Sequence, residues 1–413
     1  MNKQLQGTVN LPGSKSESNR ALMIAAYGGF PLQVENLSEA HDTVLLQTLL
    51  ENECAMATSN EVVVDCEDAG TVARFMMTYL ANKPGEWLLT GTERLCQRPV
   101  APLIDALRQL GADITCIKEH GCLPVRIHGK QIAGGRAELD TSLSSQFASS
   151  LLLASPTWKD GLHLVMKGDP VSEPYLAMTI EMMRHFGICV EVKGQTITVA
   201  SQRYKSCRFS IEADWSAASY WYEMMALSDG GCLLLKGLVP NSIQGDSVVA
   251  EMFGKLGVNT RYKSDGILVS KVKNTQAQSL EPFEFDFNSA PDLFPSVFVT
   301  CVVLNISAIF KGIATLSKKE SDRINALVTE LSKIYTFINI VSDYKIIIEK
   351  SSLKINKLNI KEVVFNTYQD HRIAMSIAAM RPQFGNVTVD VPSVVNKSYP
   401  TFWNELNGDI WVC

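Results

Sequence analysis

The sequence repeats one pattern of helix, glycine and strand at a nearly constant interval. Three segments, "LIDALRQLGADITCI", "TIEMMRHFGICVEV" and "VVAEMFGKLGVNTRY", are each typical of an amphipathic helix that stops at a glycine and passes into an alternating strand. Their glycines, Gly111, Gly187 and Gly257, lie about 70 to 76 residues apart. The interval predicts a unit of about 70 residues that mixes strands and helices and is used around six times.

The first copy shows why the pattern predicts a helix. Gly111 suits the left-handed position that ends a helix, and apolar residues recur before it at helical spacing, namely Val100, Leu103, Ile104, Leu107 and Leu110. A fourth copy, "LVTELSKIYTFINI", carries Tyr335 where glycine is expected. The order helix, glycine, strand also occurs in α/β proteins without a repeat, and that alternative stays open.

The length of the chain indicates two domains. A chain of 413 residues is too long for one ordinary core and fits two domains of roughly 200 residues each. Three of the repeated units per domain account for that length. The predicted fold class is therefore α/β, with two similar domains.

Charge and cysteine usage exclude several classes of protein. The net charge of -5 argues against a nucleic-acid binder, so any anion site requires a local concentration of Lys and Arg. Ten cysteines without a CxxC pair and six histidines without HxxxH spacing predict reduced thiols and no metal site. No signal peptide is expected, and the apolar stretch "PSVFVTCVVLNISAIF" is too short and too interrupted to span a bilayer.

One short segment predicts an anion site at the start of a helix. In "LPGSKSESNRAL", the Pro12-Gly13 pair ends a strand, and Ser14 or Ser16 can cap the helix that follows. The free backbone N–H groups of a helix start bind anions, and Lys15 adds charge there. The alternative is a plain capped helix with a solvated first turn.

The same construction recurs in "EDAGTVARFMMTYL", "SLSSQFASSLLLAS", "KKESDRINALVTEL" and "TYQDHRIAMSIAAM". These are more polar helix starts than capping requires. Together with "LCQRPV" and "VVNKSYP" they supply the candidate cations Lys15, Arg20, Arg74, Arg98, Lys319, Arg323, Arg372 and Lys397. If these residues converge, they can neutralise two phosphates, at about -1.5 to -2 each, together with two carboxylates. Spacing alone does not show convergence.

A family resemblance extends the interpretation. The motifs "LPGSKSESNRAL", "DAGTVARF", "RPVAPLIDALRQLGA", "SSQFASSLLL", "SEPYLAMT", "EADWSAASY", "APDLFP", "KKESDR", "TYQDHRIAM" and "NKSYPTFW" resemble, in this order, those of the 5-enolpyruvylshikimate-3-phosphate synthases, which are enolpyruvyl transferases. The resemblance runs from residue 11 to about residue 403. It implies an inside-out α/β barrel fold of two similar domains, each with three βαβαββ units whose helices are buried. Residues 14–213 would form the N-terminal lobe, residues 1–13 and 214–413 the C-terminal lobe, and the cleft between them the active site.

The resemblance also implies the reaction and the residues that perform it. The family transfers the enolpyruvyl group of phosphoenolpyruvate to the 5-hydroxyl of shikimate 3-phosphate, releases phosphate and uses no cofactor. A cytoplasmic monomer with small-molecule partners, without nucleic acid or membrane, is expected. The residues expected to bind shikimate 3-phosphate are Lys15, Ser16, Arg20, Ser144, Ser145, Gln146, Ser172, Tyr175, Asp292, Thr315 and Lys319. Those expected to bind phosphoenolpyruvate are Lys15, Gly70, Arg98, Gln146, Arg323, Arg372 and Lys397.

Three residues are expected to move protons. By resemblance, Asp292 accepts the hydroxyl proton and Glu320 exchanges the proton of the methylene carbon. Lys319 and Arg323 should lower the pKa of Glu320 and weaken it as an acid, which makes Lys319 a second candidate proton carrier. Without the resemblance, capping or salt bridging is the simpler role for either carboxylate. Thr315 departs from the family pattern, because some members carry Asn there.

Three other functions compete with this hypothesis. The related UDP-N-acetylglucosamine enolpyruvyl transferases carry a catalytic Cys five residues before an "RP" pair, whereas Cys96 lies only two before Arg98. A non-catalytic binder of phosphorylated metabolites would lack the proton-transfer groups, but both Asp292 and Glu320 are present. An RNA-end-processing relative would carry more positive charge.

Overall fold

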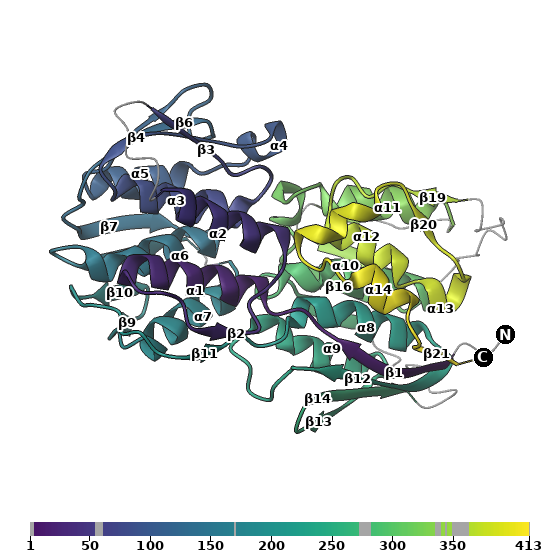
Figure 1. Ribbon diagram of the computed structural model, residues 1–413. Helices are drawn as coiled ribbons and strands as arrows, with labels where there is room; N and C mark the ends of the chain where they lie inside the picture. Colours follow the sequence, from purple (N-terminus) through teal and green to yellow (C-terminus); the bar gives the residue numbers. More distant parts are fainter. Residues whose placement is uncertain are drawn as a thin grey trace. The chain divides into compact units, whose positions relative to one another are not determined.

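The computed structural model describes residues 4–53, 61–168, 171–271, 282–334, 340–342, 345–348 and 363–412. The chain divides into two compact units (Figure 1). The N-terminal unit is Lys15–Ile211, and the C-terminal unit combines Met1–Ser14 with Glu212–Cys413. Each unit has its own sheets and its own helices. Tyr335, which interrupts the predicted glycine pattern, lies outside the described residues.

Two four-stranded sheets of the N-terminal unit share one topology. Their strand orders are β3-β4-β6-β5 and β7-β8-β10-β9. In each sheet the first two strands are parallel and the remaining neighbours are antiparallel. The strands are β3 (Val62–Asp65), β4 (Gly85–Thr90), β5 (Asp113–Cys116), β6 (Val125–Gly129), β7 (Gly135–Asp140), β8 (Leu162–Lys167), β9 (Glu191–Lys193) and β10 (Thr196–Val199).

Helices separate the strands of these sheets, so that the chain runs in the order βαβαββ twice. Two further short strands, β2 (Val34–Glu35) and β11 (Phe209–Ser210), pair in parallel. In the chain, β2 lies between the first two helices. The helices of the unit are α1 (Lys15–Gly28), α2 (His41–Glu53), α3 (Gly70–Ala81), α4 (Glu93–Cys96), α5 (Ala101–Gln109), α6 (Ser145–Ala154) and α7 (Glu173–His185).

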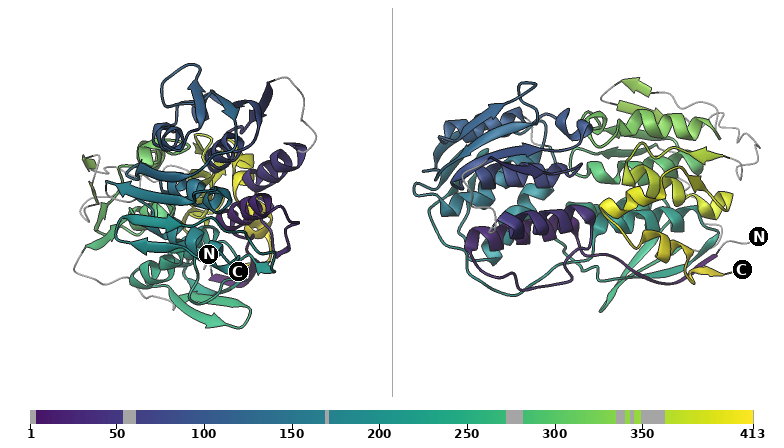
Figure 2. Two further views of the ribbon diagram at one scale, coloured as in Figure 1. Left: turned by 90° about the vertical axis from the view of Figure 1, so that its left-hand side faces the viewer. Right: turned by 45° about the horizontal axis from the view of Figure 1, so that its top comes forward.

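The C-terminal unit repeats this topology, but it takes one strand from the start of the chain. Strand β1 (Gln4–Asn10) pairs in parallel with β12 (Gly230–Lys236), and it therefore occupies the place that β3 and β7 have in their sheets. The last strand, β21 (Trp411–Val412), adds to the other edge of β1, so strands from both ends of the chain pair with each other (Figures 1 and 2).

The remaining strands of the C-terminal unit complete three sheets, of order β13-β14-β12-β1-β21, β15-β16-β18-β17 and β19-β20. They are β13 (Asn259–Lys263), β14 (Gly266–Lys271), β15 (Phe283–Asp286), β16 (Ala308–Lys311), β17 (Ile340–Ser342), β18 (Lys345–Ile348), β19 (Val364–Phe365) and β20 (Thr388–Val389). The helices are α8 (Trp215–Leu227), α9 (Val249–Lys255), α10 (Phe294–Val303), α11 (Arg323–Ser332), α12 (His371–Ala378), α13 (Arg381–Phe384) and α14 (Phe402–Asn407).

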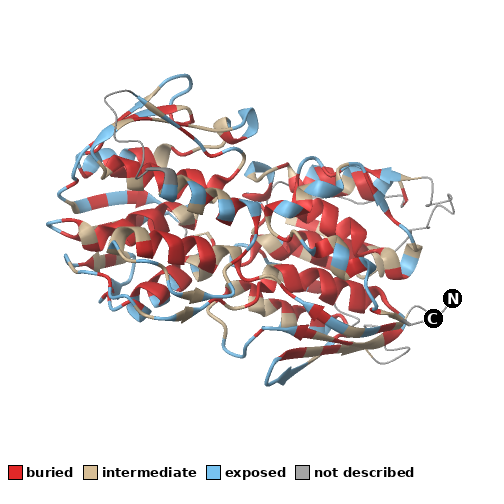
Figure 3. Ribbon diagram, viewed as in Figure 1, coloured by how far each residue is buried: buried red, intermediate tan, exposed pale blue. Residues whose placement is uncertain are grey.

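The core of each unit is made of helices. In α6, α8, α10 and α12 nearly every residue is buried (Figure 3). A helix that is apolar on all sides requires a fully buried position. The strands instead alternate between buried and exposed residues, as in β6, and thus have one face on the core and one in solvent. Helices therefore lie inside each unit and sheets cover them.

The predicted fold class is confirmed, with one difference in detail. The βαβαββ order is complete for β3–β6, for β7–β10 and for β15–β18, and the sheet of β12–β14 matches it once β1 is included. The other two sheets, β2 with β11 and β19 with β20, have only two strands in the described part of the chain. The three glycines predicted to end helices have φ angles of 94° (Gly111), 84° (Gly187) and 90° (Gly257), all left-handed.

Replacing Gly231 should weaken the attachment of the first strand. Gly231 has a φ of 122° and pairs with Leu5, and a Cβ atom there would lie 2.0 Å from the carbonyl oxygen of Leu5. We expect Gly231→Ala to lower the free energy of unfolding by more than about 2 kcal/mol, measured by urea denaturation.

The matched control is Gly254→Ala. Gly254 lies in α9 with no heavy atom within 4 Å of an added Cβ, so alanine there should be neutral or stabilising by up to about 1 kcal/mol. Equal effects of the two substitutions would contradict the role given to the close contact between β1 and β12.

Candidate active site

Three helix starts of the C-terminal unit bring charged side chains together. Asp292 precedes α10 in a short 3-10 helix, Arg323 is the first residue of α11, and Arg372 is the second residue of α12. We call the group of these residues and their ionic partners the carboxylate–guanidinium cluster. Its members are Asp292, Lys319, Glu320, Arg323, Asp370 and Arg372.

Arg323 is the centre of this cluster. Its guanidinium binds Asp292 through Nη1, Glu320 through Nη2 and Asp370 through Nε, each at 2.9 Å. The side chain is only 1% exposed. Burial alone would lower the pKa of Arg323, but the attraction of Asp370, Glu320 and Asp292 outweighs it and raises the pKa. Arg323 is therefore a fixed positive charge that orients three carboxylates.

Arg372 contacts the same carboxylates from a second helix. Its Nη2 lies 2.7 Å from Oδ2 of Asp292, and its backbone N–H donates to Oδ1 of Asp370 at 2.9 Å. Its Nη1 donates to the hydroxyl of Tyr220 on α8 at 3.4 Å. Asp370 thus caps α12 while it also binds Arg323, and it fixes the two arginines relative to each other.

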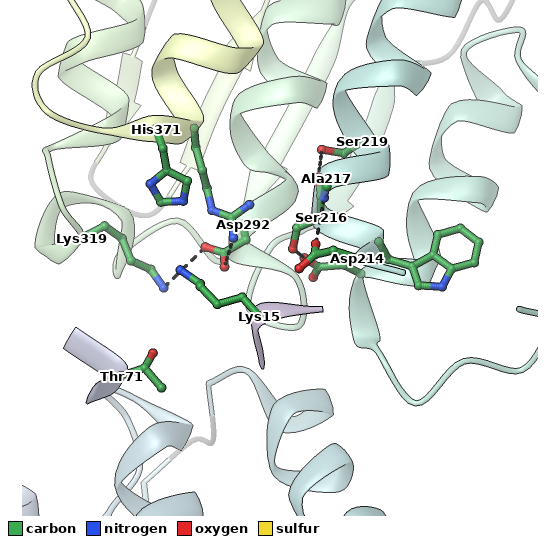
Figure 4. Close-up of polar contacts among 12 residues, drawn as sticks. Lys15, Thr71, Asp214, Ser216, Ala217, Ser219, Asp292, Lys319 and His371 are labelled. Carbon is green, nitrogen blue, oxygen red and sulfur yellow. Dashed lines mark hydrogen bonds and ion pairs between the residues drawn. The ribbon is translucent and has the colours of Figure 1, made fainter. Parts of the chain in front are cut away.

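Asp292 is surrounded by positive charge. Besides the two arginines it faces Lys319, whose Nζ lies 3.9 Å from Oδ1 (Figure 4). Burial alone would raise the pKa of Asp292, but the combined attraction of Arg372, Lys319 and Arg323 outweighs it and holds the pKa well below its ordinary value. The Asp292 side chain is nevertheless 20% exposed. In this state Asp292 is an ionised, accessible and weakly basic carboxylate.

A second buried acid lies close to the cluster. Asp246 is 2% exposed and accepts a hydrogen bond from the hydroxyl of Ser216 at the start of α8. Burial raises the pKa of Asp246 to about 6, and the negative charge of Asp292 adds to the shift, while Arg372 opposes it. The two aspartates consequently differ in charge state near pH 5.

Two further predicted site residues of this unit are buried. The hydroxyl oxygen of Thr315 has no hydrogen-bond partner among the described residues. Lys397 ends a short 3-10 helix, Pro392–Lys397, and its side chain is almost completely covered. A buried hydroxyl without a partner costs free energy, and a ligand that binds there recovers it.

In the N-terminal unit, Arg20 joins three helices. Its Nε donates to Thr179 at 2.7 Å, and its Nη2 donates to the hydroxyl of Ser149 at 3.4 Å and to the carbonyl of Tyr175 at 3.2 Å. Its Nη1 donates to the carbonyl of Ser16 at 2.9 Å. Burial lowers the pKa of Arg20 to about 10, so it remains charged at neutral pH. Arg20 therefore holds α1 against α6 and α7.

Gly70 marks the point where two guanidinium groups approach one helix start. A Cβ atom on Gly70 would lie 2.6 Å from an Nη1 atom of both Arg74 and Arg98. Arg74 donates to Gln146 at 2.9 Å, and Gln146 donates in turn to Thr71 at 3.0 Å. Helix α3 begins here without a side-chain cap. Two like charges beside uncapped N–H groups form an environment that favours an anion.

The other predicted residues of the N-terminal unit also lie at helix starts. Lys15 binds the buried carboxylate of Asp42 at 3.0 Å. Ser144 caps α6 by accepting from the N–H of Gln146, and Ser145 beside it is buried. Ser172 precedes α7 with a φ of 61°, a left-handed conformation that is uncommon for a side chain larger than glycine.

The structure thus groups the predicted residues within each unit. In the C-terminal unit, Asp292, Lys319, Glu320, Arg323 and Arg372 form one cluster. In the N-terminal unit, Gly70, Arg98 and Gln146 are linked through Arg74.

Sequence reasoning missed several partners of these residues, chiefly Asp370, Tyr220 and Asp246. For Asp370 a signal existed, because it stands at the cap position two residues before Arg372. Tyr220 and Asp246 carry no local signal that separates them from other residues of an α/β core.

The described residues contain no group of three or more His, Cys, Asp or Glu side chains placed to hold a metal ion. Within the same part of the chain, no helix combines the length and apolar character needed to cross a membrane. The eight cysteines in the described residues are free thiols.

Comparison with solved structures defines the class of protein. The chain superposes on a structure of EPSP synthase from Acinetobacter baumannii with a TM-score of 0.74, covering 98% of this chain and 96% of the other. A second structure of EPSP synthase from the same organism gives a TM-score of 0.73. Both are 23% identical in sequence. The chain therefore has the two-domain, inside-out α/β fold of EPSP synthase.

Sequence comparison identifies the family. The profile described as EPSP synthase (3-phosphoshikimate 1-carboxyvinyltransferase) matches residues 1–406. A 3-phosphoshikimate 1-carboxyvinyltransferase of Bacteroides fragilis is 40% identical over 98% of this chain and 95% of its own length. One of Methanospirillum hungatei is 35% identical over 97% and 95%, respectively. The chain belongs to the EPSP synthase family.

The raised pKa of Asp246 predicts a pH-dependent stability. Because the folded state holds this proton more tightly than the unfolded state does, the contribution is fully present below about pH 4 and is lost as the pH rises through about 6. We expect Asp246→Asn to remove this dependence, so that the variant gains on the order of 2 kcal/mol relative to wild type between pH 4 and pH 7.

Urea denaturation at stepped pH measures the effect. The control is Asp265→Asn, which changes an exposed aspartate of the same unit and should give a curve parallel to that of wild type. An Asp246→Asn curve that is also parallel to that of wild type would refute the prediction.

Proposed function

We propose that the two groups of residues described above bind the substrates of the family reaction. As a member of its family, the protein is a 3-phosphoshikimate 1-carboxyvinyltransferase, which transfers the enolpyruvyl group of phosphoenolpyruvate to the 5-hydroxyl of shikimate 3-phosphate in aromatic amino acid biosynthesis. The observation that carries the assignment of residues is the carboxylate–guanidinium cluster, in which Asp292 stays partly exposed between Arg323 and Arg372.

Phosphoenolpyruvate binds, in this proposal, to cations of both units. The residues of the C-terminal unit proposed to bind it are Arg323, Arg372 and Lys397. Those of the N-terminal unit are Gly70 and Arg98. The support is the geometry at Gly70, where two guanidinium groups lie beside an uncapped helix start. Lys15 and Gln146 are proposed to touch both substrates.

Shikimate 3-phosphate is assigned to polar groups at the starts of α1, α6 and α7 and to residues near α11. The support is that α6 begins with hydroxyl and amide side chains and that the buried Thr315 hydroxyl lacks a partner among the described residues. The residues assigned to this substrate are Lys15, Ser16, Arg20, Ser144, Ser145, Gln146, Ser172, Tyr175, Asp292, Thr315 and Lys319. Arg20 acts mainly by holding the three helices together, because its bonds go to protein groups.

The reaction needs a base for the hydroxyl and an acid for the methylene carbon. Asp292 is the proposed base. Its pKa is too low for this role while Arg372, Lys319 and Arg323 surround it. An anionic substrate that draws these cations toward itself weakens their hold on Asp292, so its pKa rises when the substrates are bound. Substrate binding thereby activates the base.

The methylene proton is assigned to Glu320 and Lys319. Glu320 is bound to Arg323 at 2.9 Å, which fixes its carboxylate, whereas Lys319 has the longer contact of 3.9 Å to Asp292. In this proposal Lys319 donates a proton and Glu320 accepts one. As further parts of the proposal, the enzyme is a cytoplasmic monomer that works without a cofactor.

The first test is phosphate release from phosphoenolpyruvate by the purified protein. We expect release with shikimate 3-phosphate and none with UDP-N-acetylglucosamine. Cys96 offers no activated nucleophile for the second reaction, because its thiol donates to the carbonyl of Gly91 at 3.4 Å. Release only with the nucleotide sugar would assign the protein to the rival transferases. Release with neither substrate would leave a binding protein.

The second test separates proton transfer from binding. Asp292→Asn should lower kcat by at least about 100-fold, because the amide cannot accept the hydroxyl proton. The KM for phosphoenolpyruvate should stay the same or fall, because Arg323 and Arg372 lose a competing carboxylate. Steady-state kinetics with Asp265→Asn as the control measures both constants. An unchanged kcat would remove Asp292 from the role of base.

A further inference from the structure

A segment of unusual backbone conformation leads into the carboxylate–guanidinium cluster. Tyr368 and Gln369 have φ angles of 54° and 56°, so two consecutive residues with side chains lie in the left-handed region. Such residues persist only where the surrounding structure holds them. Asp370 follows directly and Arg372 follows two residues later. The backbone geometry of the left-handed pair therefore decides where the side chains of Asp370 and Arg372 point.

One buried carboxylate on α11 holds this segment. Glu330 is 0% exposed and accepts four hydrogen bonds. Its Oε1 accepts from the Asn366 side chain at 3.1 Å and from the Tyr368 hydroxyl at 2.8 Å. Its Oε2 accepts from the backbone N–H of Asn366 at 2.9 Å and from Lys333. Every partner is a donor, so only a carboxylate satisfies all four.

The segment is bound to α11 at two points. Glu330 holds residues 366 and 368, and Arg323, at the start of the same helix, holds Asp370 through Nε. Seven residues of α-helix between Arg323 and Glu330 span about 10 Å, and the segment between these two points contains a tight turn that is closed by a hydrogen bond from the Asp370 N–H to the carbonyl of Thr367 at 2.9 Å. Helix α11 therefore holds this turn on both sides, through Glu330 on one and through Arg323 on the other.

We propose that Glu330 is a positioning residue for Arg372 and Asp370. It holds Asn366 and Tyr368, and thereby the left-handed pair, so that Asp370 joins Arg323 and Arg372 reaches Asp292. Glu330 itself touches no reacting atom. The kinetic consequence rests on the proposed function, in which Arg372 binds phosphoenolpyruvate; the structural consequence does not.

Two substitutions test the proposal. Tyr368→Phe removes one hydroxyl and leaves the fold intact, because Tyr368 is 40% exposed. Glu330→Gln places an amide NH₂ against at least two donors and is the stronger change. The matched control is Tyr222→Phe, which removes a hydroxyl that makes a hydrogen bond of the same 2.8 Å length, to Thr260, elsewhere in the same unit.

The first readout is amide hydrogen exchange in the ligand-free protein. We expect Tyr368→Phe to speed exchange of residues 367–372 by about 3- to 10-fold and Glu330→Gln by about 10- to 100-fold. Exchange elsewhere in the C-terminal unit should match that of the Tyr222→Phe control. Two results would overturn the proposal. One is exchange that is uniformly faster across the unit, and the other is exchange of residues 367–372 that is no faster than in the wild-type protein.

The second readout is the pattern of kinetic constants. Tyr368→Phe should raise the KM for phosphoenolpyruvate by about 3- to 10-fold, while the KM for shikimate 3-phosphate changes by less than about 2-fold. A general loss of stability would not separate the two substrates in this way. Equal changes in both constants, or no change in either, would contradict the role given to Glu330.

The two readouts separate a failure of the proposed function from a failure of the role given to Glu330. If the wild-type protein does not turn over shikimate 3-phosphate, the proposed function is wrong, and hydrogen exchange still decides whether Glu330 holds the segment. If Glu330→Gln does not fold, Tyr368→Phe decides the question alone.

Discussion

The binding of three carboxylates by one buried arginine determines the geometry of the C-terminal unit's site. Arg323 contacts carboxylates that come from the starts of three different helices or from the loops before them. Removing one partner from such a buried group leaves a charge uncompensated, at a cost of about 3 to 5 kcal/mol. The helix starts are therefore held together by charge as well as by the apolar core beneath them.

In this arrangement the cations of the cluster are held close to carboxylates of the protein. The cluster is balanced in formal charge, because its three cations face three carboxylates, and Asp292 is the carboxylate that all three cations approach. In the N-terminal unit, Arg74 and Arg98 lie beside one helix start at Gly70. Both groups place guanidinium groups at helix starts, an arrangement that favours an added anion. A family whose two substrates are both phosphorylated acids provides the required negative charge.

Most of the fold follows from local sequence, whereas much of the site does not. The left-handed glycines Gly111, Gly187 and Gly257 are readable because helix termination is a local event. The pairing of β1 with β12 is not local, and the family resemblance implied only that residues 1–13 belong to the C-terminal lobe. The cations of the cluster could be named from their motifs, but the bond between Arg323 and Asp370 joins residues 47 positions apart. No periodicity of the sequence predicts such a contact, nor the rise that the attraction of Asp370 causes in the pKa of Arg323.

The parallel pairing of β1 with β12 also determines when each unit can fold during synthesis. The N-terminal unit is continuous, Lys15–Ile211, so all of its strands are available once the ribosome has passed residue 211. Strand β1 is made first, yet its partner spans Gly230–Lys236, and β21 follows only at the end of the chain. Strand β1 therefore stays unpaired while the N-terminal unit is being made. Its exposed edge must be kept from other chains until β12 has been made.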